Sequence, residues 1–251
     1  MTLYKRGKPL SAFIFAKIFL MPVNTEIYLL LKKELAKKNV TLVAVSKTKP
    51  KEDILELYNL GHRHFGENYV QELCDKQKEL PADIRWHFIG HLQSNKVKYI
   101  APFVHLIHGV DSFKLLAEIN KQAIRNNRTI QCLLQIYIAK EETKFGLDED
   151  ELADLIAEFS NSQMKNVNIC GLMGMASFSD DMELVRNEFK ALKKLFNKFN
   201  PDVSGQHSAF NIQHLILSMG MSSDYKIAIE EGSSMVRIGS MLFGERNYSA
   251  Q

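Results

Sequence analysis

From Thr41 onward the sequence alternates between short apolar segments and longer amphipathic segments, and this alternation restricts the possible folds more than any other feature. Short apolar runs are typical of strands buried on both faces, and apolar residues spaced three and four apart are typical of helices. The predicted strands are 41–47, 63–66, 85–90, 104–109, 130–138, 167–175, 214–219 and 235–239. The predicted helices between them are 51–61, 68–80, 94–100, 112–127, 148–161, 181–199 and 223–231, and a further helix, 25–38, precedes the first strand with Asn24 as its cap.

Eight strands that alternate with helices favour a closed parallel barrel, so we predict a (β/α)8 TIM barrel of the α/β class with an extra N-terminal helix. The alternative is an open doubly wound sheet. That fold normally has a glycine-rich turn after its first strand, and residues 46–50 contain no glycine. Segment 200–212 is predicted to be a surface loop and not a linker. Residues 21–251 are therefore expected to form a single domain.

Lys47 ends the first predicted strand. Alternation along a strand places Val43, Val45 and Lys47 on one face, and Pro50 prevents the strand from continuing. In α/β barrels the carboxyl ends of the strands carry the chemistry, and a partly desolvated amine there can form an imine with an aldehyde. On position alone, a lysine that extends its amine into solvent is the more common arrangement, and the surrounding motifs decide against it.

Small and hydroxyl-bearing residues follow the last two predicted strands. Ser218 and Ser222 flank the end of the seventh strand, and Gly239 and Ser240 follow the eighth. Backbone N–H groups, helix N-termini and hydroxyls at such positions bind phosphate, and barrels commonly place a phosphate site after strands seven and eight. Each of these turns alone is a weak signal. Together with Lys47 on the same rim, they predict a site for pyridoxal phosphate.

Arg237 lies at an inward position of the eighth predicted strand. From there it can approach a pyridine nitrogen. Because a guanidinium cannot accept a proton, that nitrogen would stay unprotonated. The alternative is that Arg237 forms a salt bridge with a carboxylate such as Glu67.

The net charge of +3 is concentrated at the N-terminus. Residues 1–20 hold four basic residues and no acidic one, so the other residues carry 28 basic and 29 acidic side chains. This balance does not fit a nucleic-acid-binding protein. Cys74, Cys132 and Cys170 are widely separated and are expected to be reduced thiols of a cytoplasmic protein. From residue 21 onward the sequence has no apolar run of the roughly 18 residues that a membrane span requires.

Residues 1–20 combine a basic start with an apolar stretch, a pattern faintly similar to a signal peptide. Lys17 interrupts the apolar stretch, and no small-residue cleavage site follows it. Met21 resembles a second start. We therefore expect residues 1–20 to be a dispensable extension.

Six histidines lie between residues 62 and 108, which raises the question of a metal site. His87 and His91 are four residues apart. An apolar strand end and a glycine separate them, and no glutamate stands between them as the zinc-binding helix motif HExxH requires. No metal is expected.

Six segments strongly resemble the pyridoxal phosphate homeostasis proteins, which are single-domain relatives of the alanine racemase N-terminal barrel. They are AVSKTKP (44–50), FGENYVQE (65–72), WHFIGHLQSNK (86–96), GLMGM (171–175), SMGMS (218–222) and VRIG (236–239). The resemblance runs from about residue 40 to 248. It implies that Lys47 forms the Schiff base with the cofactor, that Asn68 lies near it and that Arg237 faces the pyridine nitrogen. It also implies that Ser218, Ser222, Gly239 and Ser240 surround the phosphate.

Two functions compete under this resemblance. One is an amino-acid racemase, whose relatives carry a second, β-rich domain that supplies a tyrosine base from the partner subunit. The eighth strand is expected to end near Gly239 and the sequence stops at Gln251, which leaves no room for such a domain. Racemisation needs acid and base groups on both faces of the substrate, and Lys47 is the one such group in evidence. We therefore predict a non-enzymatic carrier and buffer of pyridoxal 5'-phosphate that maintains vitamin B6 homeostasis. We expect a cytoplasmic monomer that passes cofactor to apo-enzymes and binds no nucleic acid or membrane.

Overall fold

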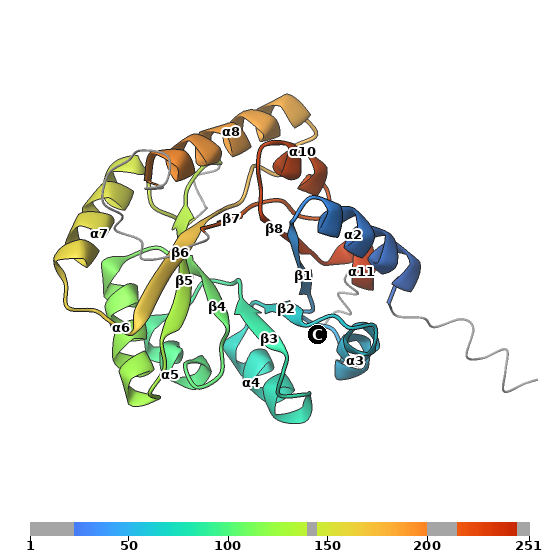
Figure 1. Ribbon diagram of the computed structural model, residues 1–251, viewed down its shortest axis with the longest axis horizontal. Helices are drawn as coiled ribbons and strands as arrows, with labels where there is room; N and C mark the ends of the chain where they lie inside the picture. Colours follow the sequence, from blue (N-terminus) through green and yellow to red (C-terminus); the bar gives the residue numbers. More distant parts are fainter. Residues whose placement is uncertain (1–22, 140–144, 200–214, 245–251) are drawn as a thin grey trace, which may run out of the picture.

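The computed structural model describes residues 23–139, 145–199 and 215–244 of the 251-residue chain. Its strands pair in parallel, each with the next along the chain, and the last pairs with the first to close a barrel (Figure 1). The strands are β1 (Thr41–Val45), β2 (His64–Glu67), β3 (Arg85–Phe88), β4 (Leu106–Val110), β5 (Ile130–Ile136), β6 (Val167–Gly174), β7 (Ile216–Ser218) and β8 (Met235–Ile238). The predicted (β/α)8 barrel is confirmed.

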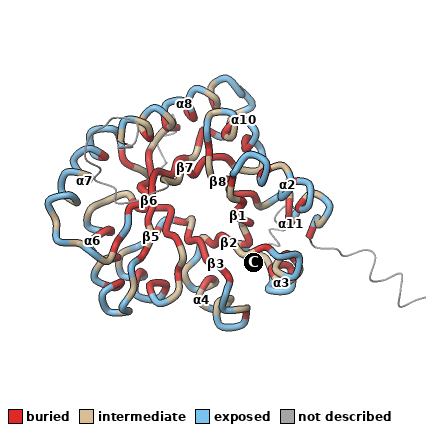
Figure 2. Tube along the Cα trace, viewed as in Figure 1, coloured by how far each residue is buried: buried red, intermediate tan, exposed pale blue. Residues whose placement is uncertain are grey.

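Helices surround the barrel and bury one side against it, as the colouring in Figure 2 shows. They are α2 (Thr25–Lys37), α3 (Lys51–Asn59), α4 (Val70–Glu79), the short 3₁₀ helix η1 (Ser94–Lys96), α5 (Val97–Ile100), α6 (Phe113–Arg125), α7 (Glu149–Asn161), α8 (Met182–Phe199), α10 (Tyr225–Glu230) and α11 (Ser240–Phe243). The extra helix before β1 is present as predicted. Asn24 caps it, because its side chain accepts the N–H of Ile27 at 3.0 Å. Within the described residues, no helix is both long and apolar enough to cross a bilayer.

Side chains alternate along each strand between the barrel interior and the layer beneath the helices. The outward residues join the large core between strands and helices, and a smaller apolar cluster fills the interior. The interior cluster consists of Val43, Leu106, Leu133, Cys170, Met173 and Met235. On β8, Met235 belongs to this interior cluster and Val236 to the outer core, so Arg237 points inward, as the alternation predicted.

A β-bulge in β6 changes the alternation locally. Cys132 and Leu134 of β5, two residues apart, pair with Ile169 and Leu172 of β6, which are three residues apart. The extra residue lets both Cys170 and Met173 face the interior. Gly171 lies in the bulge with φ of 142°, a conformation that L side chains rarely adopt.

Several predicted boundaries differ from the structure. The first strand ends at Val45 instead of Lys47, because the chain already turns at Thr48, whose φ is 63°. Pro50 precedes helix α3 as its N-cap residue and does not end the strand. The exit of the last strand, predicted without a helix, forms the single turn α11. The predictions for residues 1–20 and for the loop 200–212 lie outside the described residues.

Candidate functional site

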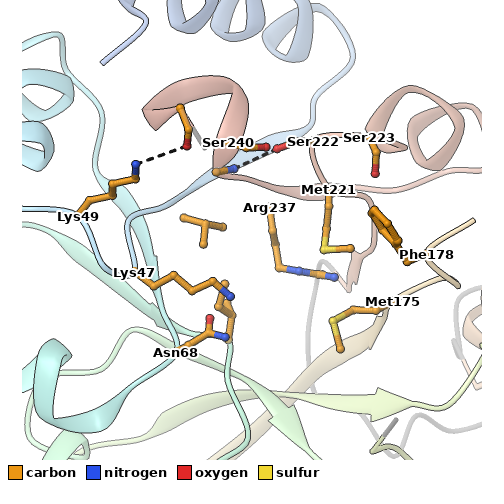
Figure 3. A pocket seen from close by; sticks show the side chains of 14 residues that line it. Lys47, Lys49, Asn68, Met175, Phe178, Met221, Ser222, Ser223, Arg237 and Ser240 are labelled. Atoms are coloured by element: carbon orange, nitrogen blue, oxygen red, sulfur yellow. Dashed lines mark hydrogen bonds between the residues drawn. The ribbon is translucent and has the colours of Figure 1, made fainter. Parts of the chain in front are cut away.

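A pocket of about 370 Å³ opens at the carboxyl ends of the strands. Six of the seven predicted site residues line it, and Figure 3 shows the side chains of five of them, Lys47, Asn68, Ser222, Arg237 and Ser240, around one cavity. The six are Lys47, Asn68, Ser222, Arg237, Gly239 and Ser240; the other lining residues are Val45, Lys49, Ile89, Met175, Phe178, Met221, Ser223 and Gly244. The volume lies in the range typical of small-molecule sites.

Lys47 lies on the turn that follows β1, and side chains of helix α4 form hydrogen bonds with the backbone of this turn. Its own side chain is half-buried at the pocket. The N–H of Thr48 donates to Glu72 at 2.6 Å, and Lys76 donates to the carbonyl of Ser46 at 2.8 Å. These bonds fix the backbone on both sides of Lys47. The amine is therefore presented by a rigid turn rather than by the strand itself.

Glu67, the last residue of β2, anchors the same turn from the outer side of the barrel. Its Oε1 accepts the hydroxyl of Ser46 at 2.6 Å and the amine of Lys76 at 2.8 Å. Burial raises the pKa of the Glu67 carboxyl to about 7, although Lys76 and Ser46 both act to lower it. The alternative of a salt bridge between Glu67 and Arg237 is wrong, because Glu67 faces the helix layer while Arg237 faces the interior.

Arg237 is buried at the floor of the pocket. One guanidinium nitrogen donates to the carbonyl of Ser218 at 2.9 Å and to its hydroxyl at 2.6 Å, and the other donates to the carbonyl of Gly174 at 3.0 Å. Burial lowers the pKa of Arg237 to about 10, so it stays charged at neutral pH. The guanidinium is thus held in one orientation beside the cavity (Figure 3).

Ser218 lies deeper than the sequence analysis placed it. It is the last, inward residue of β7, fully buried, and does not line the pocket. Its hydroxyl meets Arg237 and lies 3.3 Å from Nδ1 of His108. An inward residue within the strand lies below the rim, whereas groups that meet a ligand come after the strand. Ser218 therefore positions Arg237, whereas Ser222, Gly239 and Ser240, which follow β7 and β8, line the pocket.

The hydroxyls at this edge come from two loops that touch. The Ser222 hydroxyl accepts the N–H of Gly239 at 3.3 Å, and Ser240 is exposed at the start of α11. Helices α10 and α11 have only six and four residues, so a helix dipole adds less here than the sequence analysis assumed. The capacity to bind an anion rests on the hydroxyls and on backbone N–H groups.

Asn68 offers an independent sign of a ligand. Among the residues that the structure describes, none forms a hydrogen bond with its buried side-chain oxygen. Buried polar atoms are nearly always hydrogen-bonded. Because Asn68 lines the pocket, a polar group of a bound molecule would satisfy this oxygen.

The pocket also has an apolar wall that was not predicted from the sequence. Ile89, Met221 and Phe178 line it, and the Phe178 side chain is 91% exposed. Met175 is also at the pocket, whereas Met173 lies in the interior cluster. A loop phenylalanine has no periodic signal, so no sequence pattern could have placed Phe178 here.

The histidines are arranged differently from the pair considered in the sequence. One ring nitrogen each of His64, His87 and His105 lies within 4.8 Å of the others. His91 is separate: it lies 3.5 Å from Asp111 and stacks on Phe145. Burial lowers the pKa of His64 to about 4 and also lowers the pKa values of His87 and His105. Alternation along β2 and β3 could have placed His64 and His87 inward, but it gives no signal for His105, which precedes β4 next to the inward Leu106.

The fold is shared with solved structures of alanine racemase and of a D-threonine aldolase. The family model described as "Alanine racemase, N-terminal domain" matches residues 28–247. An alanine racemase from Bartonella henselae, solved with covalently bound pyridoxal phosphate, has a TM-score of 0.58 and 15% identity, covering 83% of this chain and 55% of that chain. At this identity the likeness shows the fold alone. The fold and the rim pocket define a barrel of the alanine racemase N-terminal class.

Proteins called pyridoxal phosphate homeostasis protein are more similar in sequence. The one from Aquifex aeolicus (strain VF5) is 42% identical over 208 residues, covering 82% of this chain and 87% of that protein. The one from Homo sapiens is 39% identical over 218 residues, covering 83% and 77%. PipY of Synechococcus elongatus PCC7942, solved with PLP bound, is 35% identical with a TM-score of 0.72, covering 82% of this chain and 93% of that chain. The chain belongs to the pyridoxal phosphate homeostasis protein family, as its motifs predicted.

Proposed function

We propose that this protein binds pyridoxal 5'-phosphate in the rim pocket and carries and buffers it, maintaining vitamin B6 homeostasis without turnover of its own. One observation supports this most directly: the same cavity is lined by a lysine on a rigid turn, a fixed arginine and three serines. The names of the relatives and the PLP-bound PipY support it independently.

Each residue has a distinct task in this proposal. When bound, the cofactor supplies an aldehyde that reacts with amines. Lys47 would hold the cofactor through its amine, the group that reacts with this aldehyde. Arg237 would hold the pyridine nitrogen side of the ring and, since it cannot accept a proton, would leave that nitrogen unprotonated. Ser222, Ser240 and the backbone at Gly239 hold the phosphate, and the amide of Asn68 contacts the ring.

The composition of the pocket favours a carrier over a racemase. Among its lining residues in the described part of the chain there is no histidine, tyrosine, cysteine or carboxylate. The other lining lysine, Lys49, donates to the carbonyl of Phe243 at 2.6 Å. A racemase needs acid and base groups on opposite faces of the substrate. In the described pocket, Lys47 lies on one side, and Arg237 lies at the floor with its guanidinium hydrogen-bonded to two backbone carbonyls.

We infer a cytoplasmic monomer that exchanges cofactor with solution or with apo-enzymes and uses neither nucleic acid nor membrane as a partner. The near balance of charges beyond residue 20 supports the absence of a nucleic-acid partner. The buried free thiols Cys132 and Cys170 suit a reducing compartment. We also propose that residues 1–20 are dispensable for binding.

Reduction with borohydride is expected to place a phosphopyridoxyl group on Lys47 and nowhere else, as read by peptide mass mapping. Lys49→Ala is the matched control, because Lys49 lines the same pocket but its amine is engaged with Phe243. This variant should keep the label, and Lys47→Ala should lose it. A label on Lys49 would contradict the assignment.

The absence of turnover is tested separately. The loaded protein is incubated at length with alanine, serine and other amino acids and analysed by chiral chromatography. No more than one equivalent of any product per protein is expected. Multiple turnovers that vanish in Lys47→Ala would restore the racemase alternative.

Arg237→Gln is expected to retain the cofactor but to shift its visible absorption, because a neutral amide replaces the charge beside the pyridine nitrogen. Ser218→Ala removes one partner of Arg237 and should shift the spectrum less in the same direction. Absorbance titration measures both the spectrum and the affinity. An unchanged spectrum with unchanged affinity in Arg237→Gln would place Arg237 away from the ring.

A further inference from the structure

Three imidazoles converge at the end of the barrel opposite the pocket. His64 is the first residue of β2, His87 is the third of β3, and His105 immediately precedes β4. These three strands are consecutive in the barrel. One nitrogen of each ring lies within 4.8 Å of the others, with His87 buried and the other two partly exposed. The function proposed above makes no use of this group.

Hydrogen bonds determine which nitrogens carry lone pairs. Arg85 contacts Nε2 of His64 at 3.2 Å, Nδ1 of His64 contacts Nε2 of His87 at 2.9 Å, and Nδ1 of His87 contacts Nε2 of His108 at 2.9 Å. Because arginine only donates, one assignment satisfies every contact in this series: His64, His87 and His108 each carry the proton on Nδ1. Nε2 of His87 therefore directs a lone pair toward His64.

We propose that His64, His87 and His105 form a binding site for a divalent transition-metal ion of the Zn²⁺ class. Neutral imidazole is the ligand that Zn²⁺, Ni²⁺ and Cu²⁺ accept, whereas Mg²⁺ and Ca²⁺ require oxygen ligands. With Zn–N bonds of about 2.0–2.1 Å, the ligand nitrogens of a tetrahedral site lie about 3.4 Å apart. The nitrogens of His64 and His87, 2.9 Å apart, would separate slightly, and all three rings, whose nitrogens lie within 4.8 Å of one another, need only small rotations. Solvent water completes a tetrahedron, because His64 and His105 are partly exposed.

The surroundings of His87 already suit a metal ligand. A metal-bound imidazole normally donates its other N–H to a neighbouring acceptor, which fixes the ring. Nδ1 of His87 makes such a contact with His108, whose own Nδ1 lies 3.3 Å from the hydroxyl of Ser218. Neither contact changes when a metal binds to Nε2 of His87. The site is therefore pre-organised at its most buried ligand.

The positive charges of Arg85 and Arg128 repel a cation at this site, and Arg85 also forms a hydrogen bond with the ligand His64. Binding through Nδ1 of His64 moves its proton to Nε2, so Arg85 can no longer donate there. Arg85 is exposed and can turn into solvent. Arg128 stays in place, because it donates to the carbonyls of Ala101 and Val104 at 2.6 and 2.7 Å. Removal of Arg85 should therefore strengthen metal binding.

Isothermal titration of the chelator-treated full chain with ZnCl₂, and the visible spectrum with CoCl₂, test the site. We expect one ion per chain and the intense visible bands of tetrahedral Co²⁺. His64→Ala and His105→Ala should each weaken Zn²⁺ binding by at least about tenfold, the lower end of the cost of losing even an outer partner. Arg85→Ala should tighten it. His91→Ala, a histidine outside the group, is the matched control and should bind as the parent chain does.

Equal Zn²⁺ affinity in the parent chain, His64→Ala and His105→Ala would overturn the proposal, as would the absence of stoichiometric binding. Circular dichroism and the melting temperature establish that each variant is folded. His87 is left intact because its full burial makes its replacement a test of folding. If a histidine variant unfolds, Arg85→Ala decides, since it retains all three ligands: unchanged or weaker affinity overturns the site.

Discussion

Gly171→Ala is expected to lower the free energy of unfolding by at least about 3 kcal/mol, through backbone strain of about 1–3 kcal/mol and a collision in addition to it. A Cβ at this position would lie 1.9 Å from the carbonyl oxygen of Ile216 on β7, and the φ of 142° suits glycine. Gly171 also pairs with Ile216 in the barrel. Relief of the collision would separate β6 from β7. Denaturant unfolding at 25 °C measures the loss.

Gly61→Ala is the matched control for Gly171→Ala. Its φ of 86° is also unfavourable for alanine, but its nearest neighbour to an added Cβ is the flexible amine of Lys32 at 3.5 Å. Only the backbone strain is then introduced, with an expected cost of about 1 kcal/mol. Equal losses in the two variants would contradict the role assigned to the bulge.

Relative to Glu67→Gln, the parent protein is expected to lose about 3 kcal/mol of unfolding free energy as the pH rises from 4.5 to 8. The folded-state pKa of Glu67 is about 7, against 4.5 for an unperturbed carboxyl, and burial is the first cause. Below pH 4.5 the carboxyl is protonated in both states. As pH rises toward 7, the unfolded chain releases a proton that the folded protein retains, so unfolding becomes easier.

The Gln variant is a suitable reference because its amide oxygen can still accept from Ser46 and Lys76. Lys76 also keeps its bond to Glu72 at 2.7 Å. Urea unfolding of both proteins across this pH range gives the difference directly, since other titrating groups affect both alike. If the parent instead gains stability relative to Glu67→Gln as the pH rises, then Lys76, and not burial, determines the direction of the Glu67 pKa shift.

Local sequence patterns were sufficient to predict the barrel architecture and the inward direction of Lys47 and Arg237. Short strands that are apolar on both faces must be covered on both faces, which a closed barrel inside a ring of helices achieves. Alternation along β1 and β8 placed Val43 and Arg237 inside, and the pairing of these two residues in the structure agrees with it. The inward direction of Lys47 followed from the same period, even though its strand ends at Val45.

The depth of each residue and its partners were decided only by the tertiary structure. Ser218 supports Arg237 instead of meeting the pocket because β7 ends at that residue. Gly171 reverses the alternation in β6, so a strict period would have misplaced Met173.

The chain by itself therefore determined the barrel, its family motifs and the faces of its strands, since each depends on residues close in sequence. The anchoring of the Lys47 turn by Lys76 and the convergence of His64, His87 and His105 needed the folded structure. These contacts depend on the stagger between neighbouring strands and on where each strand stops. Both are set by the closure and packing of the whole barrel, which no local pattern encodes.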